Sequence, residues 1–74
     1  MEIILQNGVQ LPVQVREGTE VGHIRTLRRE LEEIGAPSTF TFAVNGVGSE
    51  DNIVLTEGAV VTFRPVTGTK GKEG

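Results

Sequence analysis

The last apolar run of the chain constrains its fold most strongly. Val60 to Phe63 form a β-branched and aromatic run that follows a glycine turn, and Pro65 ends it. Such a run is typical of a buried strand, because these side chains pack well on a pleated sheet. The residues after Val66 are small, polar or charged and offer nothing suited to a core. We therefore expect a folded domain over residues 1–66 and a flexible tail over residues 67–74.

Hydrophobic burial has to stabilise this domain without disulfides or thiolate metal sites. The chain has 74 residues and no cysteine, so disulfides, thiolate metal sites and catalytic thiols are excluded. Its formal charge of −3 gives no reason to expect binding to a nucleic-acid backbone. The apolar run at the start is too short for a signal peptide or a membrane span and lacks a basic flank. We expect a cytoplasmic monomer that contacts neither nucleic acid nor membrane.

The first two strands are predicted to form a hairpin. Asn7-Gly8 separates residues 2–6 from an alternating run that continues to Val15, and both turn residues tolerate the positive φ of a type I′ turn. Pro12 has no amide hydrogen, so the second strand belongs at an edge of the sheet and the first lies inside it.

A third strand is expected over Thr39–Asn45, where Phe40, Phe42 and Val44 alternate with smaller or polar residues. Asn45-Gly46 begins another turn. We interpret residues 47–52 as a loop and residues 53–55 as a short extra strand or a 3₁₀ turn.

A helix is predicted between the two hairpins. Thr19 can cap its start, and Gly35 in the left-handed conformation, followed by Pro37, can end it. The apolar residues of this segment step by three and four and form one face: Val21, Ile24, Leu27, Leu31 and Ile34. Its Arg–Glu pairs run in the less favourable order, so packing against a sheet has to stabilise the helix.

These elements predict an α+β protein with a β-grasp fold, in which a mixed ββαββ sheet packs on one helix. The first and last strands then meet in the centre of the sheet, which buries every apolar face. The expected core comprises Ile3, Leu5, Val13, Val15, Ile24, Leu27, Leu31, Phe40, Phe42, Leu55, Val61 and Phe63.

The same alternation defines the outer face of the sheet. If Val61 and Phe63 are buried, their neighbours in the last strand point outward, beside residues of the first and third strands. This mixed face is our candidate for binding a protein partner, with Arg64 as its charged group. Its members are Ile4, Thr41, Ala43, Val60, Thr62 and Arg64.

Four short motifs mark the boundaries of the predicted elements: Met-Glu-Ile-Ile-Leu before the first turn, Glu-Gly-Thr at the helix start, Ile-Gly-Ala-Pro after the helix and Leu-Thr-Glu-Gly before the last strand. In this pattern the chain resembles ubiquitin and its relatives over nearly its whole length. The end is similar to the sulfur carriers of the molybdopterin and thiamine pathways, which close on Gly-Gly, whereas Thr69 follows Gly68 in this chain. The segment Thr-Phe-Arg-Pro-Val-Thr-Gly-Thr-Lys-Gly more closely resembles the ubiquitin-like protein C of bacterial PRTRC operons.

That resemblance implies an E1-type adenylating enzyme and a JAB-type metalloprotease as partners. It also implies a C-terminal tail that is activated, comprising Gly68, Thr69, Lys70, Gly71 and Gly74. Glycine suits this chemistry, because it lets a backbone approach ATP through a narrow channel without a Cβ clash. Three hypotheses stay open: a modifier or carrier activated through its tail, an adaptor that binds through its sheet face, and a sulfur carrier for cofactor synthesis. A terminus without a role is the alternative for the tail itself.

Other candidate sites are weak. His23 stands alone, without a second His or a Cys, so we interpret it as a partly buried or surface histidine. Glu50, Asp51 and Asn52 lack the spacing of a calcium loop, so we interpret them as a solvated turn. No arrangement of Ser, His and Asp suggests a triad, and we expect no enzyme activity, metal or cofactor. The only lysines are Lys70 and Lys72, so the predicted domain offers no lysine for chain building.

Overall fold

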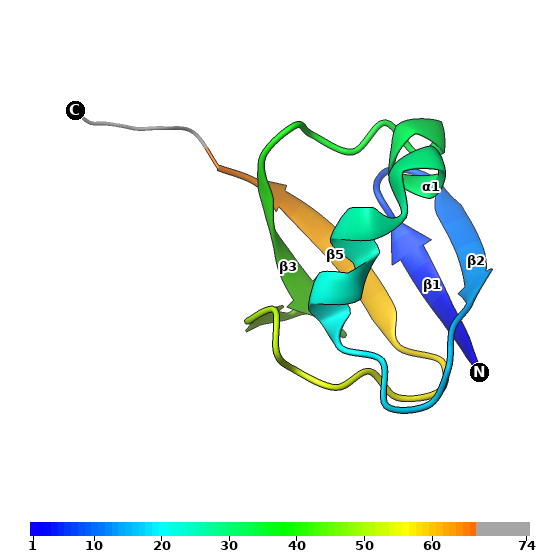
Figure 1. Cartoon of the computed structure of the whole chain (residues 1–74). Coiled ribbons are helices and arrows are strands. Elements are labelled where there is room, and N and C mark those ends of the chain that lie inside the picture. Colours follow the sequence, from blue (N-terminus) through cyan, green and yellow to red (C-terminus); the bar gives the residue numbers. More distant parts are fainter. Residues whose placement is uncertain (67–74) are drawn as a thin grey trace.

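A computed structural model describes residues 1–66 as an α+β fold, in which one five-stranded sheet carries the helical segments on one face (Figure 1). The strands are β1 (Glu2–Gln6), β2 (Gln10–Gln14), β3 (Phe40–Val44), β4 (Val47–Ser49) and β5 (Val60–Pro65). The helical segments are η1 (Val21–Thr26), a 3₁₀ helix, and α1 (Arg28–Glu33). The predicted tail, residues 67–74, lies outside the described residues.

The sheet has the expected mixed topology, with strand order β2-β1-β5-β3-β4. The first and last strands, β1 and β5, run parallel in its centre, and Leu5 lies opposite Val61. All other neighbouring strands are antiparallel. As the sequence predicted, Pro12 lies in an edge strand, β2. This confirms the β-grasp arrangement.

The second hairpin contains a strand where the sequence predicts a loop. Residues 47–49 form β4, which pairs with β3 so that Val44 lies opposite Val47. Asn45 and Gly46 have φ values of 52° and 85°, and positive φ at both positions is the signature of a two-residue type I′ turn. The turn fixes the register, and this brings a short segment of poor strand propensity into the ladder. The extra strand expected over residues 53–55 amounts to one isolated bridge between Val54 and Glu20.

The first turn differs from the predicted type I′ geometry. Three residues, Asn7 to Val9, connect the pair Gln6 and Gln10, and only Gly8 has positive φ. The side chain of Asn7 donates hydrogen bonds of 3.0 Å to the carbonyl oxygens of Ile34 and Gly35. The turn thereby caps the last carbonyls of the helical segment, a tertiary contact that local turn preferences do not contain.

The single predicted helix is in fact two short segments that meet at Leu27, whose ψ of 64° is not helical. The first amides of η1 are held from outside, because Val21 N donates to Ile53 O and Gly22 N donates to Asp51 O. Glycine and β-branched residues also make this stretch a poor α-helix. In the tighter 3₁₀ geometry residues three apart lie above one another, so Val21 and Ile24 share one fully buried face.

The C-terminal end of the helical region is as predicted, whereas its N-terminal cap is not. Gly35 has φ of 67° and donates to Glu32 O while Ala36 N donates to Leu31 O, which is the predicted left-handed termination. The predicted cap at Thr19 is wrong. Its hydroxyl donates to Arg16 O at 2.6 Å, and Glu20 occupies the capping position without a side-chain cap.

The core lies between the sheet and the helical segments. Phe40 meets the rings of Phe42 and Phe63 edge to face, with centroids 5.2 and 5.0 Å apart. Eight of the twelve predicted core residues are buried, but Val13, Val15, Leu27 and Leu31 are only partly so. The two valines lie on or just beyond an edge strand, Leu27 lies at the break between the helical segments, and Leu31 lies in α1 after it. The prediction omitted Val21, Ile34 and Ala59, which are buried.

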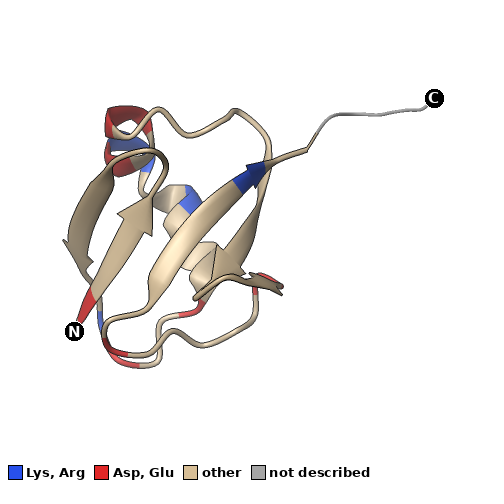
Figure 2. Ribbon diagram, turned by 180° about the vertical axis from the view of Figure 1, so that it is seen from behind, with Lys and Arg blue, Asp and Glu red and all other residues tan. Residues whose placement is uncertain are grey.

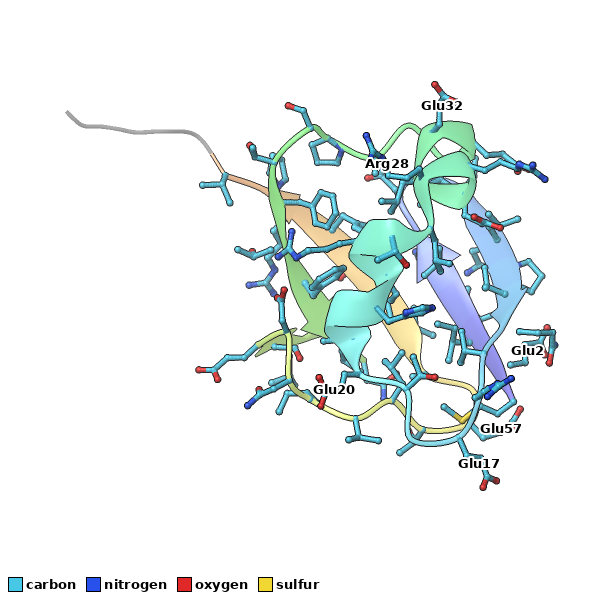
Figure 3. All side chains as sticks on the ribbon, viewed as in Figure 1. Glu2, Glu17, Glu20, Arg28, Glu32 and Glu57 are labelled. Carbon is cyan, nitrogen blue, oxygen red and sulfur yellow. The ribbon has the colours of Figure 1, made fainter. Side chains whose placement is uncertain are left out.

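Charged side chains lie outside these layers, and none is buried among residues 1–66. Glu2, Glu17 and Glu57 gather at one end of the molecule, while Arg28 and Glu32 lie at the other (Figure 3). Within the described residues, no helix has the length and apolar character needed to cross a membrane.

Candidate functional site

The predicted partner-binding face lies on the side of the sheet away from the helical segments. Cross-strand register brings its members together: Ile4 lies opposite Val60, Thr62 opposite Ala43, and Arg64 opposite Thr41. Cross-strand partners project from the same side of a sheet, so residues of β1, β5 and β3 share this surface. The structure thus places all six predicted residues on one face.

Ala43 is a correction within this set. It occupies the outer register position, yet its exposed fraction is 0%. Its cross-strand partners are Thr62 on β5 and Gly48 on β4, and its methyl group is too short to reach solvent between these neighbouring strands. Ala43 therefore shapes the floor of the face and offers no surface to a partner.

The accessible part of the face combines half-buried and exposed side chains. Ile4, Val60 and Thr62 are half-buried, whereas Thr41 and Arg64 are exposed. Figure 2 shows this face with charged segments only at its margins, at the beginning of β1 and at the end of β5. The charge at the end of β5 is Arg64 and the charge at the beginning of β1 is Glu2. The middle of the face is therefore neutral, with a cation at the end where the chain leaves the sheet.

The exit of the chain lies beside that cation. Val66 N donates to Thr39 O at 3.3 Å, and the Thr39 hydroxyl donates to Val66 O at 3.2 Å. These bonds join the end of β5 to the start of β3. The predicted tail residues Gly68, Thr69, Lys70, Gly71 and Gly74 follow in sequence and lie outside the described residues.

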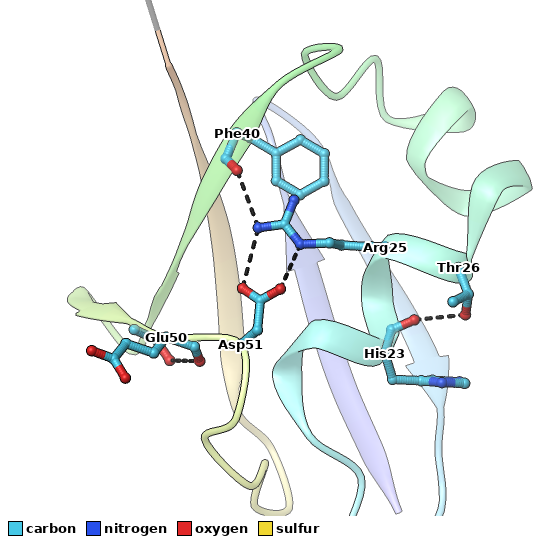
Figure 4. Close-up of polar contacts among 7 residues, drawn as sticks. His23, Arg25, Thr26, Phe40, Glu50 and Asp51 are labelled. Carbon is cyan, nitrogen blue, oxygen red and sulfur yellow. Dashed lines mark hydrogen bonds and ion pairs between the residues drawn. The ribbon is translucent and has the colours of Figure 1, made fainter.

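A polar contact on the helix side connects η1 to the loop after β4 (Figure 4). The guanidinium of Arg25 donates to Asp51 through Nε at 2.7 Å, and its carbon lies 5.0 and 4.7 Å from the ring centroids of Phe40 and Phe42. A cation at this distance over a ring face is attracted to it. The hydrogen bond from Arg25 lowers the pKa of Asp51, and the same bond raises the pKa of Arg25. We interpret this contact as structural, because it ties two segments of the fold.

The acidic loop after β4 and His23 are the remaining polar groups that the sequence singles out. Within residues 1–66, no three His, Asp or Glu side chains are grouped so that they could hold a metal ion. His23 is exposed and lines an open hollow of about 580 Å³ with Glu20, Gly22 and Asp51 among others. The carboxylate of Asp51 already forms an ion pair with Arg25.

Sequence reasoning missed a second exposed surface, at the β4 edge. Val47 and Ile53 are 69% and 45% exposed and line an apolar groove with Val44. The signal that could have found it is the two-residue turn Asn45-Gly46, which forces the residue after it, Val47, into a strand.

The strand order and the helical layer define a ubiquitin-like β-grasp fold. Among solved structures, the chain is similar to the ubiquitin of Caldiarchaeum subterraneum, with 22% sequence identity and a TM-score of 0.59, covering 92% of this chain and 98% of that one. No family model and no curated protein matches the chain. The likeness confirms the predicted fold, whereas the similarity to protein C of PRTRC operons and to sulfur carriers stays a prediction.

Proposed function

We propose that this protein is a ubiquitin-like modifier or carrier whose glycine-containing tail is activated by an E1-like enzyme. The observation that carries the proposal is the position of β5. This strand pairs with both β1 and β3 in the centre of the sheet, and the glycine-bearing segment follows it directly in sequence. A fold that presents its last strand in this way supports a protein that works through its C-terminal end.

The glycine positions suit activation of a carboxylate. Adenylation needs the backbone to approach ATP closely, and residues without a Cβ permit that approach. In this proposal the reacting residue is Gly71 after a JAB-type protease removes residues 72–74, or Gly74 without trimming. The protein itself performs no catalysis; it is the substrate of its partners.

The activating enzyme also has to recognise the folded body. Arg64 lies at the end of β5, exposed, next to the chain exit and on the margin of a neutral face. A carboxylate on the enzyme can pair with this guanidinium and so orient the tail toward the active site. The partner-binding face and the tail then act as one recognition unit.

The distribution of lysines supports a modifier that acts as a single unit. All five arginines lie within residues 1–66, and both lysines, Lys70 and Lys72, lie in the tail. Arginine cannot offer an amine for an isopeptide bond, so lysine-linked chains cannot be built on the described part of the protein.

The proposal is tested by incubating the full chain with a candidate E1-like enzyme and ATP, and by measuring pyrophosphate exchange. Gly71→Ala, Gly71→Glu and a truncation after Gly71 address the reacting end, and deletion from Thr67 onward removes the tail. Loss of exchange with the deletion and with at least one Gly71 variant is expected. Exchange that persists in all four would overturn activation through the tail.

Two alternatives give different products. A sulfur carrier would yield a thiocarboxylate on its own terminus, whereas a modifier would yield an adduct on another protein, and intact mass distinguishes them. An adaptor would give neither product but would still bind a partner. The adaptor hypothesis is supported by the neutral, partly apolar outer face with Ile4 and Val60, which is available whether or not the tail reacts.

A further inference from the structure

The two edges of the sheet differ in their capacity to accept another strand. At one edge, Pro12 of β2 lacks an amide hydrogen, and exposed Gln10 and Gln14 lie two residues before and after it. A proline at an edge blocks the pairing of a further strand, because it removes a donor from the ladder. At the other edge, β4 contains no proline and hydrogen-bonds only to β3. The β4 edge is therefore the open one.

The hairpin geometry shows which groups are free at this edge. In a two-residue hairpin the residues that flank the turn, Val44 and Val47, bond to each other. Hydrogen-bonded pairs alternate with non-bonded pairs in an antiparallel ladder, so the N–H and C=O of Gly48 point away from β3. No hydrogen bond from elsewhere in residues 1–66 reaches them. A Cβ on Gly48 would have no atom within 4 Å, so the outer face of the sheet is also uncovered beside this edge.

An apolar groove adjoins these free groups on the helix side of the sheet. It has a volume of about 280 Å³ and is lined by Val44, Val47, Gly48, Ser49 and Ile53. Val47 and Ile53 are largely exposed within the described structure. Folded proteins normally protect a strand edge that carries exposed apolar side chains, which makes this combination informative.

We propose that the β4 edge binds an extended segment of a partner protein, which adds a sixth strand to the sheet. One residue of that segment exchanges two hydrogen bonds with Gly48. Gly48 pairs with Ala43 on the outer side of the sheet, so the two neighbours of the bound residue point into the groove. The structure thus specifies a segment with two apolar side chains separated by one residue.

Charge at the end of β4 adds a further requirement. Glu50 follows β4, is exposed and forms no ion pair within residues 1–66, whereas Asp51 is neutralised by Arg25. A basic residue that flanks the apolar pair would complement Glu50.

A second copy of this chain fits less well. Each copy carries a formal charge of −3, and the strand has three residues. Two paired copies of so short a strand fall below the roughly 1,200 Å² that a stable interface buries.

The probe is a synthetic peptide of alternating threonine and valine with a lysine at each end, titrated into the ¹⁵N-labelled full chain. We expect shifts confined to residues 47–49 and 53, slower hydrogen exchange of the Gly48 amide, and a dissociation constant of about 0.1–1 mM, as for a small transient contact. A peptide with glutamates in place of the lysines should bind more weakly.

Variants separate the two parts of the contact. Val47→Ser, at an exposed position, should weaken binding about tenfold by removing apolar contact. Gly48→Pro removes the outward N–H and should abolish binding, whereas the matched Gly48→Ala keeps it and should change little. Val9→Ser alters an exposed valine of the other hairpin and serves as the control.

Three outcomes would overturn the proposal. The first is the absence of shifts at Gly48 with the lysine-flanked peptide, and the second is equal binding by Gly48→Pro and Gly48→Ala. The third is concentration-dependent dimerisation without peptide that Val47→Ser abolishes, which would assign the edge to a second copy of the chain.

Discussion

Gly22 and Asp51 approach each other so closely that no side chain fits at position 22. A Cβ built on Gly22 would lie 2.9 Å from both the Cβ and the backbone oxygen of Asp51. Alanine is a better helix former than glycine by about 1 kcal/mol, so propensity alone predicts that Gly22→Ala stabilises η1. Because Asp51 has to move, we expect a net loss of about 1–3 kcal/mol in the free energy of unfolding instead, as measured by denaturant titration.

The matched control for that substitution is Gly48→Ala. Gly48 also lacks positive φ, and its added Cβ would meet no atom within 4 Å. Its free energy of unfolding should therefore stay within about 0.5 kcal/mol of the parent. Equal effects of the two variants would contradict the close contact at Gly22.

The pair of Arg25 and Asp51 predicts an acid-sensitive component of stability. Its hydrogen bond lowers the pKa of Asp51 below the ordinary value of 3.8, so the stabilisation is present above that pH and is lost as the pH falls through the lowered pKa. We expect the stability difference between the parent and Asp51→Asn to be largest near neutral pH and to shrink below about pH 4. In an Arg25→Gln background that difference should no longer depend on pH, as denaturant titrations across the range would show.

Two core positions that look equivalent in sequence should differ in their contribution to stability. Phe42 is 1% exposed and packs against two other rings, so Phe42→Ala should cost about 3–5 kcal/mol. Leu27 is only partly buried at the break between η1 and α1, and Leu27→Ala should cost about 1–2 kcal/mol. Denaturant melts of both variants test the order, and a larger loss at Leu27 would contradict its partial burial at the break.

The outer face should bind ubiquitin receptors weakly. Ala43 is fully buried and Thr62 is polar, so the face lacks the apolar patch that ubiquitin presents to its receptors. An NMR titration with a generic ubiquitin-binding domain should give at most a millimolar complex, and micromolar affinity with shifts at Thr62 would refute this. A cognate partner that pairs with Arg64 should lose at least about tenfold in affinity with Arg64→Ala, since charge-assisted hydrogen bonds contribute about 1.5–3 kcal/mol.

The sequence predicted the architecture because its strongest signals are local. Alternation placed Phe40 and Phe42 inward, and Gly35 ended the helical region as expected. The two Asn-Gly pairs show that a local signal does not determine the conformation of a turn by itself. Asn45 adopts positive φ, whereas Asn7 does not, because its side chain bonds to the end of the helical region instead. Identical dipeptides thus took different conformations in different tertiary settings.

The candidate sites depended more heavily on contacts between distant residues. The outer face followed from alternation, but the burial of Ala43 depends on its neighbours in two other strands. Arg25 and Asp51 are 26 residues apart, so no local pattern predicts their contact. The break at Leu27 could not be predicted from the local sequence either, because the amides that start η1 donate to the loop over residues 51–53.

The central position of β5 also determines how the domain folds and unfolds. The hairpin of β1 and β2 and the hairpin of β3 and β4 have no direct strand pairing with each other; each is joined to the sheet only through β5. A nascent chain on the ribosome therefore cannot assemble the sheet until residues 60–65 have emerged, and folding has to bring together strands separated by most of the domain. Unfolding should accordingly be all-or-none, and a fragment ending before Val60 should not retain the fold.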